Sequence, residues 1–125
     1  MVGIDIVDIA RITDIIERYG ERFLNKVFTE EEIRYAQRKK RVQESLAGRF
    51  AAKEAFMKAI GRRLSWKEIE ISQVDARPYI CYKNDLYREV SISHERNYAV
   101  SVVVIDEQGR IEEKGERRKD RKSVV

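Results

Sequence analysis

One stretch of this 125-residue sequence constrains its architecture more than any other: Leu46-Ala47-Gly48-Arg49-Phe50-Ala51-Ala52-Lys53-Glu54-Ala55-Phe56. It lies inside a helical pattern that we expect to run from about Gln43 to Ile60. Gly61 follows as a C-cap, because glycine is the usual residue just past the end of a helix. The stretch is rich in alanine and glycine, and such small side chains let a helix lie close to a sheet or a ligand.

The first segment of the chain reads as a short strand followed by a helix. Apolar residues alternate along Val2–Val7, and Asp8 can cap a helix that we expect to reach about Asn25. Its apolar stripe, at spacings of three and four, consists of Ile9, Ile12, Ile16, Tyr19 and Phe23. One flank of that stripe carries Arg11, Arg18 and Arg22, and the other carries Asp14, Glu17 and Glu21. The basic flank is either a solvated helix surface or a dock for an acidic partner.

The remaining elements are one more helix and a run of strands. Thr29 and Glu32 form a capping-box pattern that opens a helix through about Arg38. After the long helix, alternating residues and turn residues predict strands at Glu68–Val74, Tyr79–Lys83, Val90–Ser93 and Tyr98–Ile105. The last is long and largely apolar, which favours a central strand covered on both faces. This order predicts an α+β fold with helices packed on a largely antiparallel sheet.

Length and composition favour one folded domain with a charged tail. Hydrophobic residues make up 42% of the chain and charged residues 38%, which is a folded composition with a dense charged surface. We expect the domain to span residues 1–111 and residues 112–125 to be disordered, because the tail is almost devoid of apolar residues. Six basic and two acidic residues fall in Lys114–Val125, and this excess equals the chain's net charge of +4. The folded body is therefore close to neutral.

Scarce residue types exclude several classes of site. The single cysteine, Cys81, excludes an internal disulfide and a Cys/His metal cluster. No apolar run is long enough to cross a membrane, and the first residues lack the basic start of a signal peptide. We expect a cytoplasmic protein. His94 is the only histidine, and it is either a surface or hydrogen-bonded residue or a catalytic group.

Two acidic residues, Asp5 and Glu54, lie in predominantly apolar segments of the chain. Asp5 lies within the apolar strand at the parity opposite to its isoleucines, so it either faces solvent from an edge strand or is paired or bound to a metal. Glu54 and Lys58 are one helical turn apart, which is typical of an ordinary salt bridge. With Lys53 they also form a narrow charged stripe on a small, apolar helix. Two such carboxylates suit Mg²⁺ and a phosphate ligand.

Three segments of the chain occur together in one known family. They are Val2-Gly3-Ile4-Asp5-Ile6-Val7-Asp8-Ile9 with Arg11-Ile12, the stretch Leu46–Phe56 with Lys58-Ala59 and Gly61, and Ser91-Ile92-Ser93-His94 with Tyr98-Ala99-Val100. In this order and at this separation they resemble the small holo-acyl-carrier-protein synthases of the phosphopantetheinyl transferase superfamily. The resemblance covers roughly residues 2–105, and the second segment is its most specific part.

The resemblance implies a role for each matching residue. Asp5 and Glu54 match the family's Mg²⁺ ligands, and Lys58 matches a lysine that contacts the phosphate of coenzyme A. His94 matches a histidine near the nucleotide that bears the 3′-phosphate. Basic groups for the coenzyme A phosphates match Lys40, Arg41 and Arg49.

The implied reaction is transfer of the 4′-phosphopantetheine arm of coenzyme A to a serine of apo-acyl carrier protein, with release of 3′,5′-ADP, in support of fatty acid biosynthesis. Glu54, Lys58 and Asp5 are the implied catalytic residues, and the base is Glu54, Asp5 or a water on the metal ion. The carrier protein is expected to dock on the flank of Arg11, Arg18 and Arg22. Family members of this length form trimers with active sites at subunit boundaries, so a homotrimer is expected.

Two other readings stay open on the sequence. A small nucleic-acid-binding protein is favoured by the isoelectric point of about 9.2 and the basic run Arg38–Arg41, but the neutral body argues against it. A non-catalytic relative that only binds coenzyme A is the other. Its support is the loop after Gly61, which is short and carries one glycine where the family usually has a glycine-rich loop. Arg62 or Arg63 could replace backbone contacts there by charge.

Overall fold

The computed structural model of the chain describes residues 1–106 and has the predicted α+β fold. In chain order its elements are β1 (Val2–Asp8), α1 (Ile9–Tyr19), α2 (Glu21–Val27), α3 (Glu30–Gln37), α4 (Val42–Ile60), the 3-10 turn η1 (Trp66–Glu68), β2 (Ile69–Val74), β3 (Arg77–Tyr82), β4 (Asp85–Tyr87), β5 (Val90–His94) and β6 (Tyr98–Val104). The expected domain end at residue 111 and the expected tail 112–125 lie outside the described residues.

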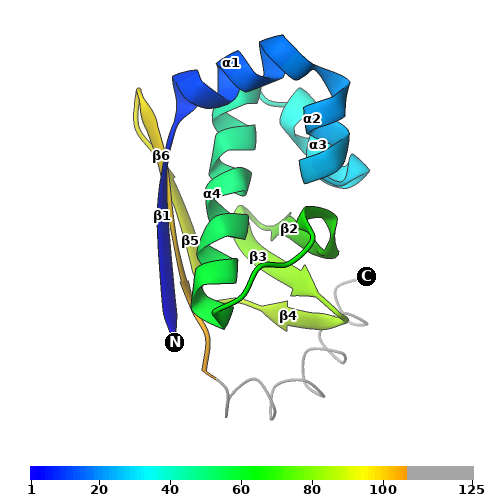
Figure 1. Cartoon of the computed structure of the whole chain (residues 1–125). Helices are drawn as coiled ribbons and strands as arrows, with labels where there is room; N and C mark the ends of the chain where they lie inside the picture. The colour runs from blue at the N-terminus through cyan, green and yellow to red at the C-terminus, as the bar shows by residue number, and fades with distance from the viewer. Residues whose placement is uncertain (107–125) are drawn as a thin grey trace.

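Two antiparallel sheets flank the long helix. The first has the strand order β1-β6-β5 and the second the order β2-β3-β4. Figure 1 shows α4 running between them, with α1 across one end of the helix and with α2 and α3 beside its first half. The sequence predicted one largely antiparallel sheet, so the antiparallel pairing is confirmed and the division into two sheets is new.

Glycines set the distance between α4 and the first sheet. A Cβ placed on Gly3 of β1 would lie 1.9 Å from the Ala55 carbonyl oxygen and 2.7 Å from the Ala59 nitrogen. A Cβ on Gly48 would lie 2.5 Å from Nε2 of His94 on β5. Helix α4 therefore contacts β5 near its start and β1 near its end, so it crosses the sheet diagonally.

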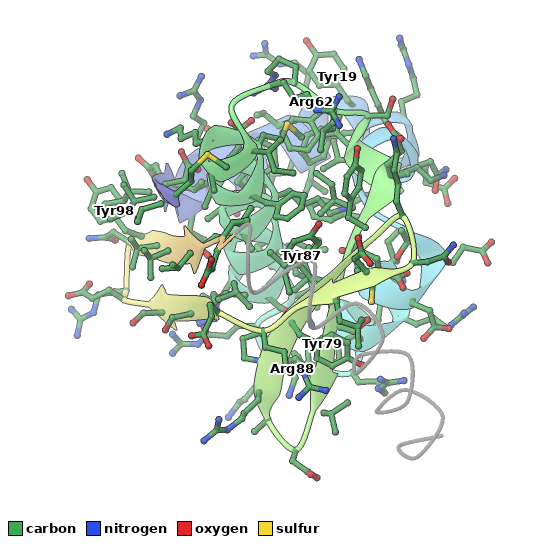
Figure 2. All side chains as sticks on the ribbon, turned by 90° about the horizontal axis from the view of Figure 1, so that it is seen from below. Tyr19, Arg62, Tyr79, Tyr87, Arg88 and Tyr98 are labelled. Carbon is green, nitrogen blue, oxygen red and sulfur yellow. The ribbon has the colours of Figure 1, made fainter. Side chains whose placement is uncertain are left out.

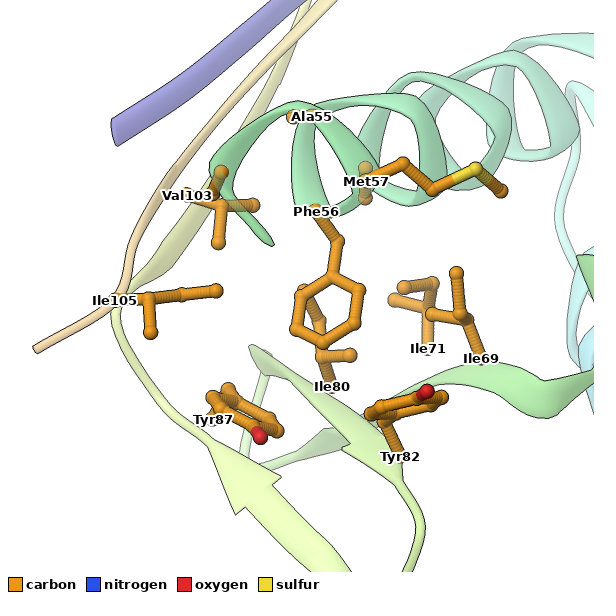
Figure 3. Packing of buried hydrophobic residues seen from close by; sticks show 12 residues of the cluster. Ala55, Phe56, Met57, Ile69, Ile71, Ile80, Tyr82, Tyr87, Val103 and Ile105 are labelled. Carbon is orange, nitrogen blue, oxygen red and sulfur yellow. The ribbon is translucent and has the colours of Figure 1, made fainter. Parts of the chain in front are cut away.

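The core of the second sheet is built around Phe56 of α4. Its ring packs edge-on against Tyr82 and Tyr87, at centroid distances of 5.5 Å and 5.0 Å. Figure 3 shows Phe56 projecting from the helix towards these two tyrosines, with Ile80 close by. These side chains are buried, and their contacts hold α4 on the β2-β3-β4 sheet.

Several local predictions are confirmed. Asp8 caps α1, the Thr29 and Glu32 capping box opens α3, and Gly61 ends α4 in the left-handed region at φ 87°. The predicted continuous helix to Asn25 is wrong, because Gly20, at φ 55°, ends α1 and a second helix begins at Glu21.

Tyr19 and Lys53 also depart from their predicted environments. Tyr19 is 49% exposed rather than part of a buried stripe, since it lies in the last turn of α1 just before the break. Lys53 is fully buried and does not belong to a charged stripe. Its Nζ lies 2.7 Å from Oε1 of Glu32 and donates to the carbonyls of Val27 and Trp66.

Strand β6 is central, as predicted, but within the chain only one of its faces is covered. Ala99, Ser101 and Val103 are buried beneath α4. The opposite face carries apolar side chains that line up across β1 and β6 and stay exposed or half-exposed: Val2, Ile4, Ile6, Tyr98, Val100, Val102 and Val104. We call this set the outer apolar face. Figure 2 shows Tyr98 on the side of the sheet away from α4.

Candidate active site

Asp5 faces inward from β1 and is paired with Lys58 of α4. The Lys58 ammonium donates to Oδ1 of Asp5 at 2.9 Å and to the carbonyl oxygen of Ile4 at 3.1 Å. The Asp5 side chain is only 15% exposed, whereas Ile4 and Ile6 on either side of it are at least 60% exposed. The strand thus turns its isoleucines outward and its acid towards the helix, the reverse of a solvent-facing aspartate.

Glu54 lies beside this pair and is held by a second basic residue. Arg63 donates from Nη1 to Oε2 of Glu54 at 3.2 Å and from Nη2 to Oε1 at 3.4 Å. Burial raises the pKa of the Asp5 carboxyl above its ordinary value, and the charge of Glu54 raises it further, while the hydrogen bond from Lys58 opposes both. The two carboxylates are therefore close enough for each to feel the other's charge.

This carboxylate pair fits a divalent cation. The two partly buried acids repel each other, and the positive charge that offsets this repulsion comes from Lys58 and Arg63, which a divalent cation could replace. Mg²⁺ takes one or two protein carboxylates and fills its other positions with water and phosphate oxygens. Within residues 1–106, no three His, Cys, Asp or Glu side chains gather to form a closed metal cage.

A cavity of about 410 Å³ opens on the other side of α4. It collects four of the five residues predicted to bind coenzyme A, namely Lys40, Arg41, Arg49 and His94. The fifth, Lys58, lies with Asp5 instead. The remaining lining residues are Tyr35, Lys39, Glu44, Ser45, Gln73, Ala76, Pro78 and Ile92. Four basic side chains and one histidine against a single acid make this cavity suited to an anion.

Arg49 is the most constrained basic residue of the cavity. It is 4% exposed, its guanidinium carbon lies 3.9 Å from the centroid of the Tyr35 ring, and Nη1 donates to the Ser45 hydroxyl at 3.5 Å. Burial lowers the pKa of Arg49 from its ordinary value. Among the described residues its Nε finds no hydrogen-bond partner, so a donor is directed at no protein atom. An anionic ligand would supply the missing acceptor.

The two groups of predicted residues lie at opposite edges of the first sheet. Asp5 is on β1 and His94 on β5, with β6 between them. Neighbouring strands are about 4.8 Å apart, so the two backbones are about 10 Å apart across the sheet. Helix α4 lies on the face that both side chains share. The structure therefore brings Asp5, Glu54 and Lys58 together, and separately brings Lys40, Arg41, Arg49 and His94 together.

The three arginines of the expected carrier dock are all exposed, but they do not share one helix. Arg11 and Arg18 lie on α1, and Arg22 lies on α2 beyond the break at Gly20. The spacing that grouped them assumed a continuous helix, and it holds only for the first two.

Sequence reasoning missed Tyr35 and did not distinguish Arg63 from its neighbour. The Tyr35 ring contacts three cations, because Arg38 and Lys39 approach it as well as Arg49. The only signal was its place just before the basic run Arg38–Arg41. For Arg63, adjacent arginines at 62 and 63 were visible, and only the structure shows which one reaches Glu54.

Comparisons with known proteins point to one family. The model of the 4′-phosphopantetheinyl transferase superfamily matches residues 1–103. The holo-[acyl-carrier-protein] synthase of Halothermothrix orenii is 43% identical, over 85% of this chain and 96% of the relative. The synthase of Thermus thermophilus is 39% identical, over 87% of this chain and 94% of its own length.

Solved structures of the same kind share the fold. Helicobacter pylori holo-[acyl-carrier-protein] synthase, in complex with coenzyme A, has a TM-score of 0.77 at 34% identity and covers 85% of this chain and 100% of that one. The Bacillus anthracis synthase, in complex with coenzyme A (3′,5′-ADP), has a TM-score of 0.70 at 34% identity and covers 82% and 91%. In the part of this chain described here, no helix is long and apolar enough to cross a membrane.

Proposed function

The chain belongs to the 4′-phosphopantetheinyl transferase superfamily, and from this we propose that it moves the 4′-phosphopantetheine arm of coenzyme A onto a serine of an apo-acyl carrier protein. The serine oxygen attacks the β-phosphorus of coenzyme A and forms a new P–O bond. The bond from that phosphorus to the bridging oxygen breaks, 3′,5′-ADP leaves, and the serine proton passes to a base. The proposal rests on one observation: Asp5 and Lys58 form an ion pair beside Glu54. This pair brings together two segments of the family resemblance that are far apart in the sequence.

The residues at the β1 edge would handle the pyrophosphate. Asp5 and Glu54 are the residues that would hold Mg²⁺, and the ion would neutralise charge on the phosphate oxygens. The Lys58 side chain is 53% exposed, so its ammonium can turn from Asp5 to a phosphate oxygen without leaving water. A mobile ammonium beside two carboxylates can therefore stabilise negative charge that grows as the P–O bond breaks.

The cavity beside α4 would bind the nucleotide end of coenzyme A. Its basic lining suits the phosphates, and the unpartnered Nε of the buried Arg49 suits one phosphate oxygen in particular. His94 lies against α4 at Gly48, where a larger residue would displace the imidazole. Relatives solved with coenzyme A support this assignment of the ligand.

We propose further that the complete site is shared between two copies of the chain. Asp5 and His94 lie on opposite outer strands of one sheet, so a copy packed against this one can bring its His94 edge towards the Asp5 edge of its neighbour. The outer apolar face supplies a surface for that contact, because Val2, Ile4 and Ile6 are each at least 60% exposed. We therefore propose a homotrimer with three sites between copies.

The carrier protein would bind the exposed arginines of the first two helices. Carrier docking on Arg11 and Arg18, with Arg22 contributing from α2, needs only an acidic partner and exposed guanidinium groups. A cytoplasmic location and a role in fatty acid biosynthesis belong to the same proposal.

The test is the mass of a carrier protein. Apo-acyl carrier protein is incubated with the chain, coenzyme A and Mg²⁺, and its intact mass is measured. A gain of one phosphopantetheine arm, lost when EDTA replaces Mg²⁺, supports the proposal. An unchanged carrier together with tight binding of coenzyme A would mean a non-catalytic relative. Salt-dependent RNA binding without coenzyme A binding would mean a nucleic-acid-binding protein.

A further inference from the structure

Arg63 engages both carboxylate oxygens of Glu54, and it lies outside the three segments that carry the family resemblance. The two contacts, at 3.2 Å and 3.4 Å, come from different nitrogens of one guanidinium. This fork arrangement occupies the oxygens that a metal ion would need. A cation that binds Glu54 must therefore share them with Arg63 or displace it.

The neighbouring arginine does something else. Nη2 of Arg62 donates to the hydroxyl of Tyr82 at 3.2 Å, on the side of the β2-β3-β4 sheet. The two arginines carry the same charge and adjoin in sequence, yet their side chains diverge. Arg62 is therefore a matched reference for what Arg63 does through contact with Glu54 rather than through charge alone.

Arg63 is the movable partner of its pair. Its side chain is 69% exposed, while that of Glu54 is 18% exposed and fixed on α4. The guanidinium carbon also lies 5.6 Å from the centroid of the Trp66 ring. Trp66 is the only tryptophan of the chain, so its fluorescence reports on the position of Arg63.

We propose that Arg63 is an internal counter-ion that a divalent cation displaces from Glu54, and that the freed guanidinium then binds a phosphate oxygen of coenzyme A. The proposal rests on the proposed function, because it takes Glu54 as a cation ligand. A guanidinium fork matches phosphate as well as carboxylate, so Arg63 can exchange one for the other. In the short loop after Gly61, the N–H groups of Arg62 and Ser65 already donate to Met57 and Glu68, which favours a side chain as the phosphate contact there.

The first measurement is the affinity for Mn²⁺ in the absence of coenzyme A. Electron paramagnetic resonance of the free ion gives this affinity. Arg63→Ala is expected to bind Mn²⁺ about fivefold more tightly than the wild type, since the competing pair is lost. Arg63→Lys keeps the charge without the fork and should fall between the two. Arg62→Ala should match the wild type, and circular dichroism checks the fold of each variant.

The second measurement follows the exchange itself. Adding Mg²⁺ and coenzyme A should change Trp66 fluorescence in the wild type and Arg62→Ala, but not in Arg63→Ala. Calorimetry in Mg²⁺ should show coenzyme A binding about tenfold more weakly to Arg63→Ala, as for the loss of one charged hydrogen bond.

Mn²⁺ affinity in Arg63→Ala equal to or weaker than that of the wild type would overturn the displacement, and so would an equal gain in Arg62→Ala. Unchanged affinity for coenzyme A would overturn the exchange. If the wild type modifies its carrier and one of these contradicting results is obtained, the inference fails and the proposed function stands. If the wild type leaves its carrier unmodified, the proposed function fails, and the Mn²⁺ comparison still decides whether Arg63 competes for Glu54.

Discussion

Gly3 of β1 lies so close to Ala55 of α4 that a Cβ on the glycine would come within 1.9 Å of the Ala55 carbonyl oxygen. This contact places the strand directly on the helix backbone. Two residues further along β1, the same packing sets Asp5 beside Lys58 and Glu54. The carboxylate pair therefore depends on the absence of one methyl group.

Gly3→Ala should move β1 away from α4 and lower the free energy of unfolding by about 3 kcal/mol, because a backbone contact cannot relax as a side chain can. Urea unfolding measures the loss, and Mn²⁺ binding by the remaining folded protein should weaken at the same time. Ser93→Ala, on an exposed position of β5, is the control. Unfolding energies within about 0.5 kcal/mol of each other for the two variants would contradict the account.

Lys53 and Lys58 stand five residues apart on α4 and should respond in opposite ways to the same substitution. Lys53→Met leaves the buried Glu32 carboxylate without its cation and should lower the free energy of unfolding by about 3–5 kcal/mol. Lys58→Met removes a half-exposed side chain and its ion pair with Asp5, and should lower the free energy of unfolding by about 1 kcal/mol or less while abolishing most transfer activity. Urea unfolding and carrier mass measure both. A stable Lys53→Met or an active Lys58→Met would be inconsistent with these environments.

Asp5→Asn should remove activity without lowering stability in the absence of metal. Burial raises the pKa of Asp5 in the folded chain, so the stabilisation linked to its proton is complete below the unfolded pKa and is lost as pH rises through the folded pKa. At neutral pH the ionised carboxylate is thus a net cost. In EDTA, Asp5→Asn should melt at or above the wild-type temperature, with the difference shrinking towards pH 4. A melting temperature several degrees lower would show that the charge stabilises the fold.

The sequence anticipated those features that depend on neighbouring residues. The parity of Val2–Val7, the Thr29 and Glu32 capping box and the end of α4 at Gly61 are set by local geometry, and all three are present. The break at Gly20 was visible as a glycine within a helical pattern, but periodicity outweighed it. Strand β4 is three residues long, which is too short to show alternation.

Tertiary features of the site were beyond a local argument. The alternation of residues along β1 is equally compatible with Asp5 facing solvent and with Asp5 facing the helix. Only the contact of Gly3 with Ala55 decides between the two orientations. Lys53 stands one turn from the buried Met57, which was a signal for burial, but nothing in the sequence named Glu32 as its partner. The separation of Asp5 from His94 depends on strand order, which residue spacing does not contain.

A site shared between copies can be tested by mixing two damaged variants. Asp5→Asn and His94→Ala should each lose most activity alone, and mixed trimers should recover about a quarter of the wild-type rate, because that share of interfaces unites an intact Asp5 with an intact His94. Initial rates of carrier modification measure the recovery. Adding Ile6→Glu to both variants should dissociate the copies at the outer apolar face and remove the recovery. Mixtures no more active than their parts would mean that each chain holds a whole site.

The central claim is that Asp5 and Glu54 hold one divalent cation, and the most direct measurement is an anomalous difference map of crystals grown with Mn²⁺ and coenzyme A. The account predicts one peak within coordination distance, about 2.0–2.6 Å, of both carboxylates. A peak bound by neither residue, or two separate peaks on the two acids, would contradict it.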